Sequence, residues 1–144
     1  MIGASVRRWN DLPLGLRDSF KARFSLSAID AFATLSGDFN PLHVSEDAAR
    51  SAGFRGRVIH GLLSSSLYSR LVGMHLPGTY SVLQAIDIGF RNAIFADDDL
   101  EVSGEIVARS EAARVVQIRA QILRNGLVLS SAKIRVGILA EAFD

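Results

Sequence analysis

Hydrophobic residues follow two different periods along this chain. Between Phe20 and Leu26, apolar and polar side chains alternate, which is the period-two pattern of a half-buried strand. From Gly61 to about His75, leucines recur every three or four residues and predict one long amphipathic helix. Beyond residue 79 the chain returns to the strand pattern in four segments: YSVLQAIDIGF (80–90), DLEVSGEIVAR (99–109), ARVVQIRAQIL (113–123) and LVLSSAKIRVGIL (127–139).

Two short helices are predicted between the first strand and the long helix. Ser27, with Asp30 three residues later, resembles a helix-capping pair, and Gly37 is a natural end for the helix that follows. Ser45 precedes two acidic residues and predicts the start of a second short helix, which Gly53 closes. The two helices therefore flank the segment GDFNPLH.

The order of these elements predicts the fold class. Asn125-Gly126 is a strong hairpin signal between the last two strands. A strand, short helices, one long apolar helix and then antiparallel strands indicate an α+β domain whose sheet wraps around the helix. We expect a single domain over residues 1–144, with residues 1–18 as an irregular lead-in. Such a sheet has exposed edge strands, and pairing two copies edge to edge predicts a homodimer.

Composition narrows the classes of partner and the compartment. The 144 residues are 49% hydrophobic and carry a net charge of +1 without a concentrated basic face, so we expect no nucleic-acid partner. The most apolar segment is interrupted by serines and Arg70, which argues against a membrane span. Cysteine is absent, and the N-terminal residues lack the pattern of an export signal, so we expect a cytoplasmic protein.

The segment GDFNPLH contains the candidate chemistry. Pro41 restricts its own backbone and that of Asn40, so the chain turns between Asp38 and His43. A carboxylate and an imidazole that share one water molecule make a general acid–base pair near neutral pH. The alternative is that Asp38 caps the turn and His43 packs in the core.

The neighbouring residues resemble a known family. The chain reads FATLSGDFNPLH, with Phe32 and an unbroken Ser-Gly-Asp-x-Asn-Pro-Leu-His run, and a His60-Gly61 pair opens the long helix. This pattern closely resembles the MaoC-like family of (R)-specific enoyl-CoA hydratases and acyl dehydratases, which have the hot-dog fold. The likeness extends from about Phe20 to Leu139.

The resemblance implies a hydro-lyase that adds water to a trans-2-enoyl-CoA to give the (R)-3-hydroxyacyl-CoA, reversibly. Asp38 and His43 would be catalytic, although the sequence does not decide which is the formal base. Gly61 would bind the thioester oxygen at the start of the long helix, where the dipole favours negative charge. The resemblance implies no cofactor beyond the coenzyme A of the substrate. The supporting residues would be Ser69, Asn40 and His60.

Other interpretations stay open at this point. The substrate can instead be a branched, dicarboxylic or carrier-protein-linked acyl thioester, or the chain can be a non-catalytic acyl-thioester-binding partner subunit. A hot-dog thioesterase would not require both Asp38 and His43. No metal is expected, because the three histidines lack the spacing of helical zinc sites. Arg55 and Arg57 are candidates for contacts with the phosphates of coenzyme A.

Overall fold

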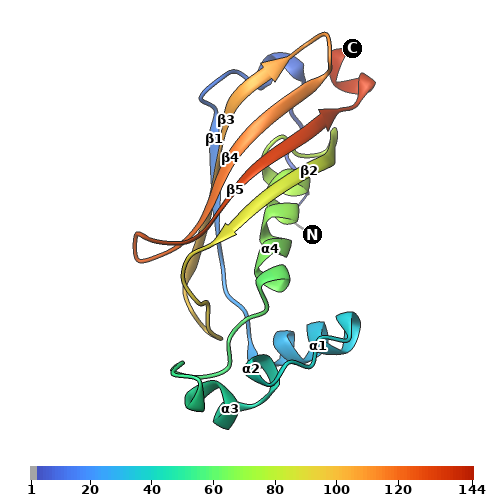
Figure 1. The fold of residues 1–144 in the computed structure, drawn as a ribbon. Helices are drawn as coiled ribbons and strands as arrows, with labels where there is room; N and C mark the ends of the chain where they lie inside the picture. Colours follow the sequence, from blue (N-terminus) through green and yellow to red (C-terminus); the bar gives the residue numbers. More distant parts are fainter. Residues whose placement is uncertain (1–2) are drawn as a thin grey trace.

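The alternating segments form a five-stranded antiparallel sheet that curves around one helix (Figure 1). The computed structural model describes residues 3–144. The strands lie in the order β1-β3-β4-β5-β2, so the strand nearest the N-terminus is at one edge and β2 is at the other. Their bounds are β1 (Arg17–Ala22), β2 (Ser81–Phe90), β3 (Leu100–Ser110), β4 (Val115–Arg124) and β5 (Leu127–Ile138).

The long helix predicted from the leucine spacing is present. It consists of α4 (Gly61–Arg70), which continues without a break into the π-helical turn η2 (Leu71–His75). Leu63, Leu67 and Tyr68 are buried against the sheet, and burying each large apolar side chain stabilises the fold by about 1.5–3 kcal/mol. The same packing fixes the position of Gly61 at the N-terminal end of α4.

Three short helices gather beyond one end of the sheet (Figure 1). They are α1 (Leu26–Ser36), α2 (Pro41–Val44) and α3 (Glu46–Ser51). The predicted cap of the first helix was wrong by two residues: Ser25, not Ser27, accepts the bond from the Ala28 N–H, at 3.2 Å. The α2 turn was not predicted at all. It begins at Pro41 because the Asn40 side chain caps it.

The first strand is also shifted from its predicted place. It begins at Arg17 and ends at Ala22, because β3, its pairing partner, begins at Leu100 opposite Ala22. The segment before it is ordered by packing. Trp9, in the 3₁₀ turn η1 (Trp9–Asp11), stacks on Phe143 of the C-terminal turn η3 (Ala140–Phe143) with ring centroids 4.9 Å apart.

The edge strand β2 is mostly exposed. Four large apolar side chains on it are between 38% and 55% exposed: Val82, Leu83, Ile86 and Phe90. Its only hydrogen-bonded neighbour in the described sheet is β5, so its other edge has unpaired backbone groups. Across residues 3–144, none of the helices combines the length and apolarity that crossing a bilayer requires.

Candidate active site

The loop from Gly37 to Asn40 is fixed by its own side chains. Gly37 follows α1 with a φ of 79°, a left-handed conformation that favours glycine. The Ser36 hydroxyl accepts from the Asp38 N–H at 3.1 Å, and Asp38 Oδ1 accepts from the Asn40 N–H at 3.1 Å. Asn40 Oδ1 then accepts from the Leu42 N–H at 3.0 Å. Each polar side chain therefore orders the next residues, and Asn40 supports both Asp38 and the start of α2.

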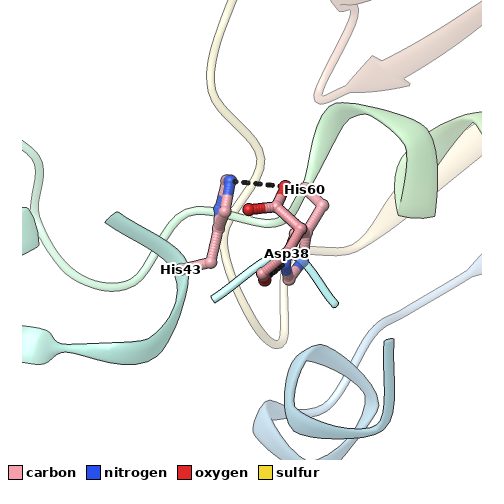
Figure 2. A group of neighbouring side chains, drawn as sticks. All are labelled: Asp38, His43 and His60. Carbon is pink, nitrogen blue, oxygen red and sulfur yellow. Dashed lines mark hydrogen bonds and ion pairs between the residues drawn. The ribbon is translucent and has the colours of Figure 1, made fainter. Parts of the chain in front are cut away.

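His43 is held in one tautomer by a backbone carbonyl. Its Nδ1 lies 2.7 Å from the carbonyl oxygen of Val58. Because a carbonyl only accepts, Nδ1 carries the proton, and in the neutral ring Nε2 has a free lone pair. Nε2 lies 3.9 Å from Asp38 Oδ2 (Figure 2). His43 can therefore accept a proton on the side that faces Asp38.

The spacing between these two groups suits an intervening water. A separation of 3.9 Å is too long for a direct hydrogen bond but allows one water to contact both groups. The Asp38 side chain is 50% exposed and the His43 side chain 15%, so the carboxylate faces solvent while the imidazole is mostly enclosed. An ionised Asp38 and a neutral His43 both accept, which is the arrangement that orients and deprotonates water.

His60 lies directly against this pair. Its ring stacks on the His43 ring at a centroid distance of 3.9 Å and an angle of 26°, and Phe32 meets it edge-on at 4.8 Å. His60 Nε2 donates to the carbonyl oxygen of Asp38 at 3.0 Å. The sequence likeness placed His60 among the supporting residues, and the fold brings it into contact with both Asp38 and His43.

These three side chains are poorly arranged for a metal ion. Donor atoms of Asp38, His43 and His60 lie within 4.8 Å of one another. However, ring lone pairs lie in the ring plane, and the stacked rings of His43 and His60 hold them in two nearly parallel planes rather than pointing toward one centre. A tetrahedral ion needs converging donors. The geometry therefore suits proton transfer better than metal binding.

Gly61 begins α4 beside His43. The first N–H groups of a helix have no partners within it, and the helix dipole makes this end positive. A Cβ atom at Gly61 would lie 3.1 Å from the ring of Phe90. Glycine therefore keeps the space between the helix N-terminus and Phe90 open, as an oxyanion-binding position requires.

A cavity of about 310 Å³ extends from His43 and Gly61 toward the sheet. It has a mostly apolar lining. At its sheet side, the buried Ser130 hydroxyl bonds the Tyr68 hydroxyl at 2.6 Å, and burial raises the pKa of Tyr68. The remaining lining residues are Phe54, Val58, Ile59, Ser64, Phe90, Arg91, Asn92, Ala93, Ile94 and Leu129.

The structure does not bring Ser69 to Asp38. Ser69 is exposed on the second turn after Gly61, and the hydrogen bonds of residues 3–144 include none between it and Asp38. Two other serines act at the start of α4 instead. The hydroxyls of Ser64 and Ser65 both donate to the Gly61 carbonyl, at 2.7 and 2.8 Å, and steady the first turn.

The sequence did not reveal that Val58 and Arg57 position His43. Val58 selects the tautomer, and Arg57 donates from Nε to the His43 carbonyl at 2.6 Å while its other end pairs with Asp30. Both ends of the Arg57 guanidinium therefore already have partners within the protein. This argues against Arg57 as a candidate for contact with coenzyme A phosphates. Arg55 pairs with Asp98, and its side chain remains 61% exposed. No local pattern signals Val58, because the contact depends on how the chain returns to α2.

Four larger hollows lie away from this site on the described part of the chain. Their volumes are about 640, 500, 440 and 400 Å³. They are lined mainly by residues of the sheet, and none is lined by Asp38, His43 or Gly61. The smaller cavity at the helix N-terminus combines His43, whose Nε2 faces Asp38, with a mostly apolar lining.

Known proteins share this sequence and fold. The (R)-specific enoyl-CoA hydratase of Aeromonas caviae is 32% identical over 119 residues, which cover 83% of this chain and 89% of that protein. The 3-hydroxybutyryl-CoA dehydratase of Methylorubrum extorquens is 36% identical over 101 residues, covering 70% of this chain and 64% of that protein. A mitochondrial 3-hydroxyacyl-[acyl-carrier-protein] dehydratase of Arabidopsis thaliana is 40% identical over 77 residues, covering 54% of this chain. This chain spans 45% of the length of the Arabidopsis protein.

Solved structures agree with the predicted α+β hot-dog fold, which is confirmed. The (R)-hydratase from A. caviae involved in PHA biosynthesis superimposes with a TM-score of 0.84 at 30% identity, covering 88% of this chain and 97% of that one. A MaoC-like dehydratase from Rhodospirillum rubrum gives 0.78 at 26% identity, covering 92% and 96%. The family model described as MaoC like domain matches residues 11–126. The relatives named above are hydratases and dehydratases, and this chain belongs to the MaoC-like family.

Proposed function

We propose that this protein adds water to trans-2-enoyl-CoA to form (R)-3-hydroxyacyl-CoA and catalyses the reverse dehydration. The observation that carries the proposal is the free Nε2 of His43, 3.9 Å from Asp38 Oδ2 and beside the N-terminus of α4. Hydratase and dehydratase relatives at 32% and 36% identity support the reaction class.

The reaction needs water activation and charge stabilisation at the same time. Asp38 and His43 hold one water and accept its proton as its oxygen bonds the β-carbon of the enoyl group. The electron pair of the double bond moves toward the thioester oxygen, where the N–H groups at Gly61 stabilise the developing negative charge. The α-carbon then takes a proton from the pair. No cofactor is needed in this scheme, because coenzyme A belongs to the substrate.

The cavity gives the acyl chain a place next to the reacting groups. Its apolar lining, including Ile94 and Leu129, favours a hydrocarbon tail, while His43 and Gly61 lie at the end where the thioester reacts. A volume of about 310 Å³ is at the lower end of ligand pockets. We therefore propose that short acyl chains are preferred over long ones.

The direct test is hydration of crotonyl-CoA by the purified protein. The enoyl absorbance should fall, and chiral analysis should identify the (R)-alcohol as the product. Asp38→Asn serves as the inactive control at equal concentration. Formation of the (S)-alcohol, or equal rates for the wild type and the control, would refute the proposal.

A carrier-protein-linked substrate is the second candidate. The observation that favours it is the 40% identity to a 3-hydroxyacyl-[acyl-carrier-protein] dehydratase. Coenzyme A and acyl carrier proteins present the acyl group on the same kind of arm, so the dyad chemistry is unchanged. Comparing kcat/KM for crotonyl-CoA and a crotonyl-carrier protein distinguishes the two. A non-catalytic partner subunit is disfavoured by the intact dyad, and activity of the chain alone would exclude it.

We also propose that the protein is a homodimer paired along β2. The exposed apolar side chains Val82, Leu83 and Ile86 lie on a strand with one unpaired edge, and a second copy covers both. Ile86→Lys should shift the mass in light scattering from dimer toward monomer. Lys21→Glu, on the opposite edge strand β1, is the control and should leave the mass unchanged. A monomeric wild type would contradict this proposal.

A further inference from the structure

His60 has an unusual combination of burial and incomplete bonding. Its side chain is 1% exposed, and its Nε2 donates to the carbonyl of Asp38. Because Nε2 carries the proton, Nδ1 is a bare acceptor when the ring is neutral. Nδ1 is buried and has no hydrogen-bond partner among the described residues. Buried polar atoms are nearly always paired, so an unpaired one at a functional site requires an explanation.

Three features around His60 oppose a second proton on its ring. A proton on Nδ1 would create a buried cation without a partner for that N–H. His60 is also the residue that precedes α4, where the positive end of the helix dipole opposes a further positive charge. The third feature is His43 itself, whose ring lies 3.9 Å away and gains a proton during the proposed reaction. Two charged rings at this separation would repel each other.

A neutral ring stacked on a charged one is stabilising. The face of an aromatic ring attracts a cation, more strongly when both are shielded from water. We propose that His60 is a positioning residue whose neutral ring is a platform for His43 while His43 holds the proton taken from water. This inference rests on the proposed hydratase function and adds a residue role to the same site.

The same ring also connects the two members of the dyad. Its Nε2 holds the backbone of Asp38, and its face holds the plane of the His43 ring. The separation of 3.9 Å between Nε2 of His43 and Asp38 Oδ2 therefore depends on one rigid side chain. A rotation of either group would move it off the shared water.

The charged groups around His43 are few and can be named. Asp38 faces its Nε2, and Arg57 donates to its backbone carbonyl. The charge of Arg57 is paired with Asp30 on α1, and the backbone N–H of Arg57 donates to Glu46 Oε2 on α3 at 3.3 Å. The substitutions proposed below leave all four charged groups in place and change only the side chain of residue 60.

Two variants separate the platform from the hydrogen bond. His60→Phe keeps an aromatic face and loses the donor to the Asp38 carbonyl. His60→Gln keeps a side-chain N–H donor and loses the aromatic face. His75→Gln is the matched control, because His75 also stacks on an aromatic ring, Phe20, at 4.5 Å but lies at the end of η2, away from the dyad. Circular dichroism confirms that each variant is folded.

Nitrogen-15 NMR of the histidine rings is the primary measurement. The chain has three histidines, so the variants themselves assign the signals. In the wild type, the His60 signals should show the proton on Nε2 and a bare Nδ1 at the pH of the activity assay. The midpoint of the His43 titration should fall by about half a unit to one unit in His60→Gln. In His60→Phe and His75→Gln, the His43 midpoint should stay within about 0.2 pH unit of the wild-type midpoint.

The pH dependence of kcat/KM on crotonyl-CoA gives the second readout. Its acid limb should shift with the NMR midpoint in His60→Gln and stay in place in His60→Phe. A His60 ring that carries protons on both nitrogens at the assay pH, or equal midpoints for His43 in the two variants, would overturn the platform role. If neither variant folds, the wild-type spectrum alone decides whether His60 is neutral.

The two proposals fail in different ways. The NMR titration uses no substrate, so inactivity toward every enoyl-CoA leaves the platform result standing and refutes only the hydratase function. Conversely, an active enzyme whose His43 midpoint ignores the His60 substitutions refutes the platform alone.

Discussion

Residues 3–144 include two histidine–aspartate pairs with nearly the same spacing. His43 Nε2 lies 3.9 Å from Asp38 Oδ2, and His75 Nδ1 lies 4.0 Å from Asp18 Oδ1. Each histidine also stacks on an aromatic ring, His43 on His60 and His75 on Phe20. One pair lies near the start of α4 and the other at the end of η2.

In the pair at His75, both carboxylate oxygens of Asp18 already have other partners. Asp18 Oδ2 pairs with Arg7 at 2.9 Å, and Oδ1 accepts from the Ser19 N–H at 2.8 Å. Arg7 also donates to the His75 carbonyl, and Arg70 covers the outer face of the Phe20 ring at 4.3 Å. This carboxylate joins the N-terminal segment to β1 and η2, and its position is structural.

The pair at His43 keeps acceptors available. Asp38 Oδ2 has no hydrogen bond among the described residues, and its side chain is half exposed. The free Nε2 of His43 faces it, and His43 lines the cavity that Gly61 also lines. The comparison shows that spacing alone does not make an acid–base pair. The groups also need unsatisfied lone pairs and access to a cavity.

The largest expected difference between the two pairs is the effect of substitutions on kcat. Asp38→Asn and His43→Ala should each lower kcat for enoyl-CoA hydration by at least about 100-fold, because each removes a proton-transfer group. Asp18→Asn and His75→Gln should change kcat by less than about threefold. Steady-state kinetics on the four folded variants make the comparison. A large loss in the His75 pair would contradict its structural assignment.

Glycine substitutions at the two ends of the long helix should also differ in their effect on kcat/KM. This difference should be smaller than the one between the two histidine–aspartate pairs. Gly61→Ala places a methyl group 3.1 Å from Phe90 and crowds the proposed oxyanion position, so kcat/KM should fall by about tenfold. Gly73→Ala is the control, because its Cβ would have no neighbour within 4 Å and it lies near His75. Equal kcat/KM for Gly61→Ala and the wild type would argue against an oxyanion site at Gly61.

A third polar pair, Tyr68 and Ser130, should contribute to stability and not to turnover. Tyr68 and Ser130 are buried and bonded to each other, so Tyr68→Phe leaves a buried hydroxyl without its partner. The free energy of unfolding should fall by about 1–3 kcal/mol, with kcat nearly unchanged. Urea denaturation measures the first quantity. A loss of kcat comparable to that of the dyad variants would move this pair into the active site.

Tyr68→Phe should also change how the free energy of unfolding depends on pH in alkaline solution. Burial raises the pKa of Tyr68 above its ordinary value of 10.0, so above that pH the unfolded chain binds fewer protons at this residue than the folded one. Its contribution to stability is therefore present below pH 10.0 and is lost as the pH rises further. The stability of Tyr68→Phe should decline less steeply there than that of the wild type. Parallel declines would contradict the assignment.

The elements with strong periodicity were predictable from the sequence. The long helix begins at Gly61 as expected, and the Asn125-Gly126 turn joins β4 to β5. The bounds of β1 were not predictable, because they are fixed by where β3 offers pairing partners rather than by local alternation. The cap at Ser25 was missed for a related reason: Ser25 and Ser27 are equivalent residue types in sequence.

The candidate site was predictable only where it is local in sequence. Asp38, Asn40 and His43 lie within six residues, and their roles in the turn follow from residue type. The contacts from Val58 and His60 come from a segment that returns to the loop through tertiary packing. The same packing leaves Ser69 exposed, which helical spacing from Gly61 did not reveal.

The measurement that tests the central claim most directly is a double-mutant cycle on the dyad. If Asp38 and His43 act on one shared water, Asp38→Asn/His43→Ala should be about as slow as either single variant, because groups that act as a unit are strongly non-additive. Multiplication of the two losses, to about 10,000-fold from two 100-fold effects, would show that the residues act independently and would contradict the shared-water account.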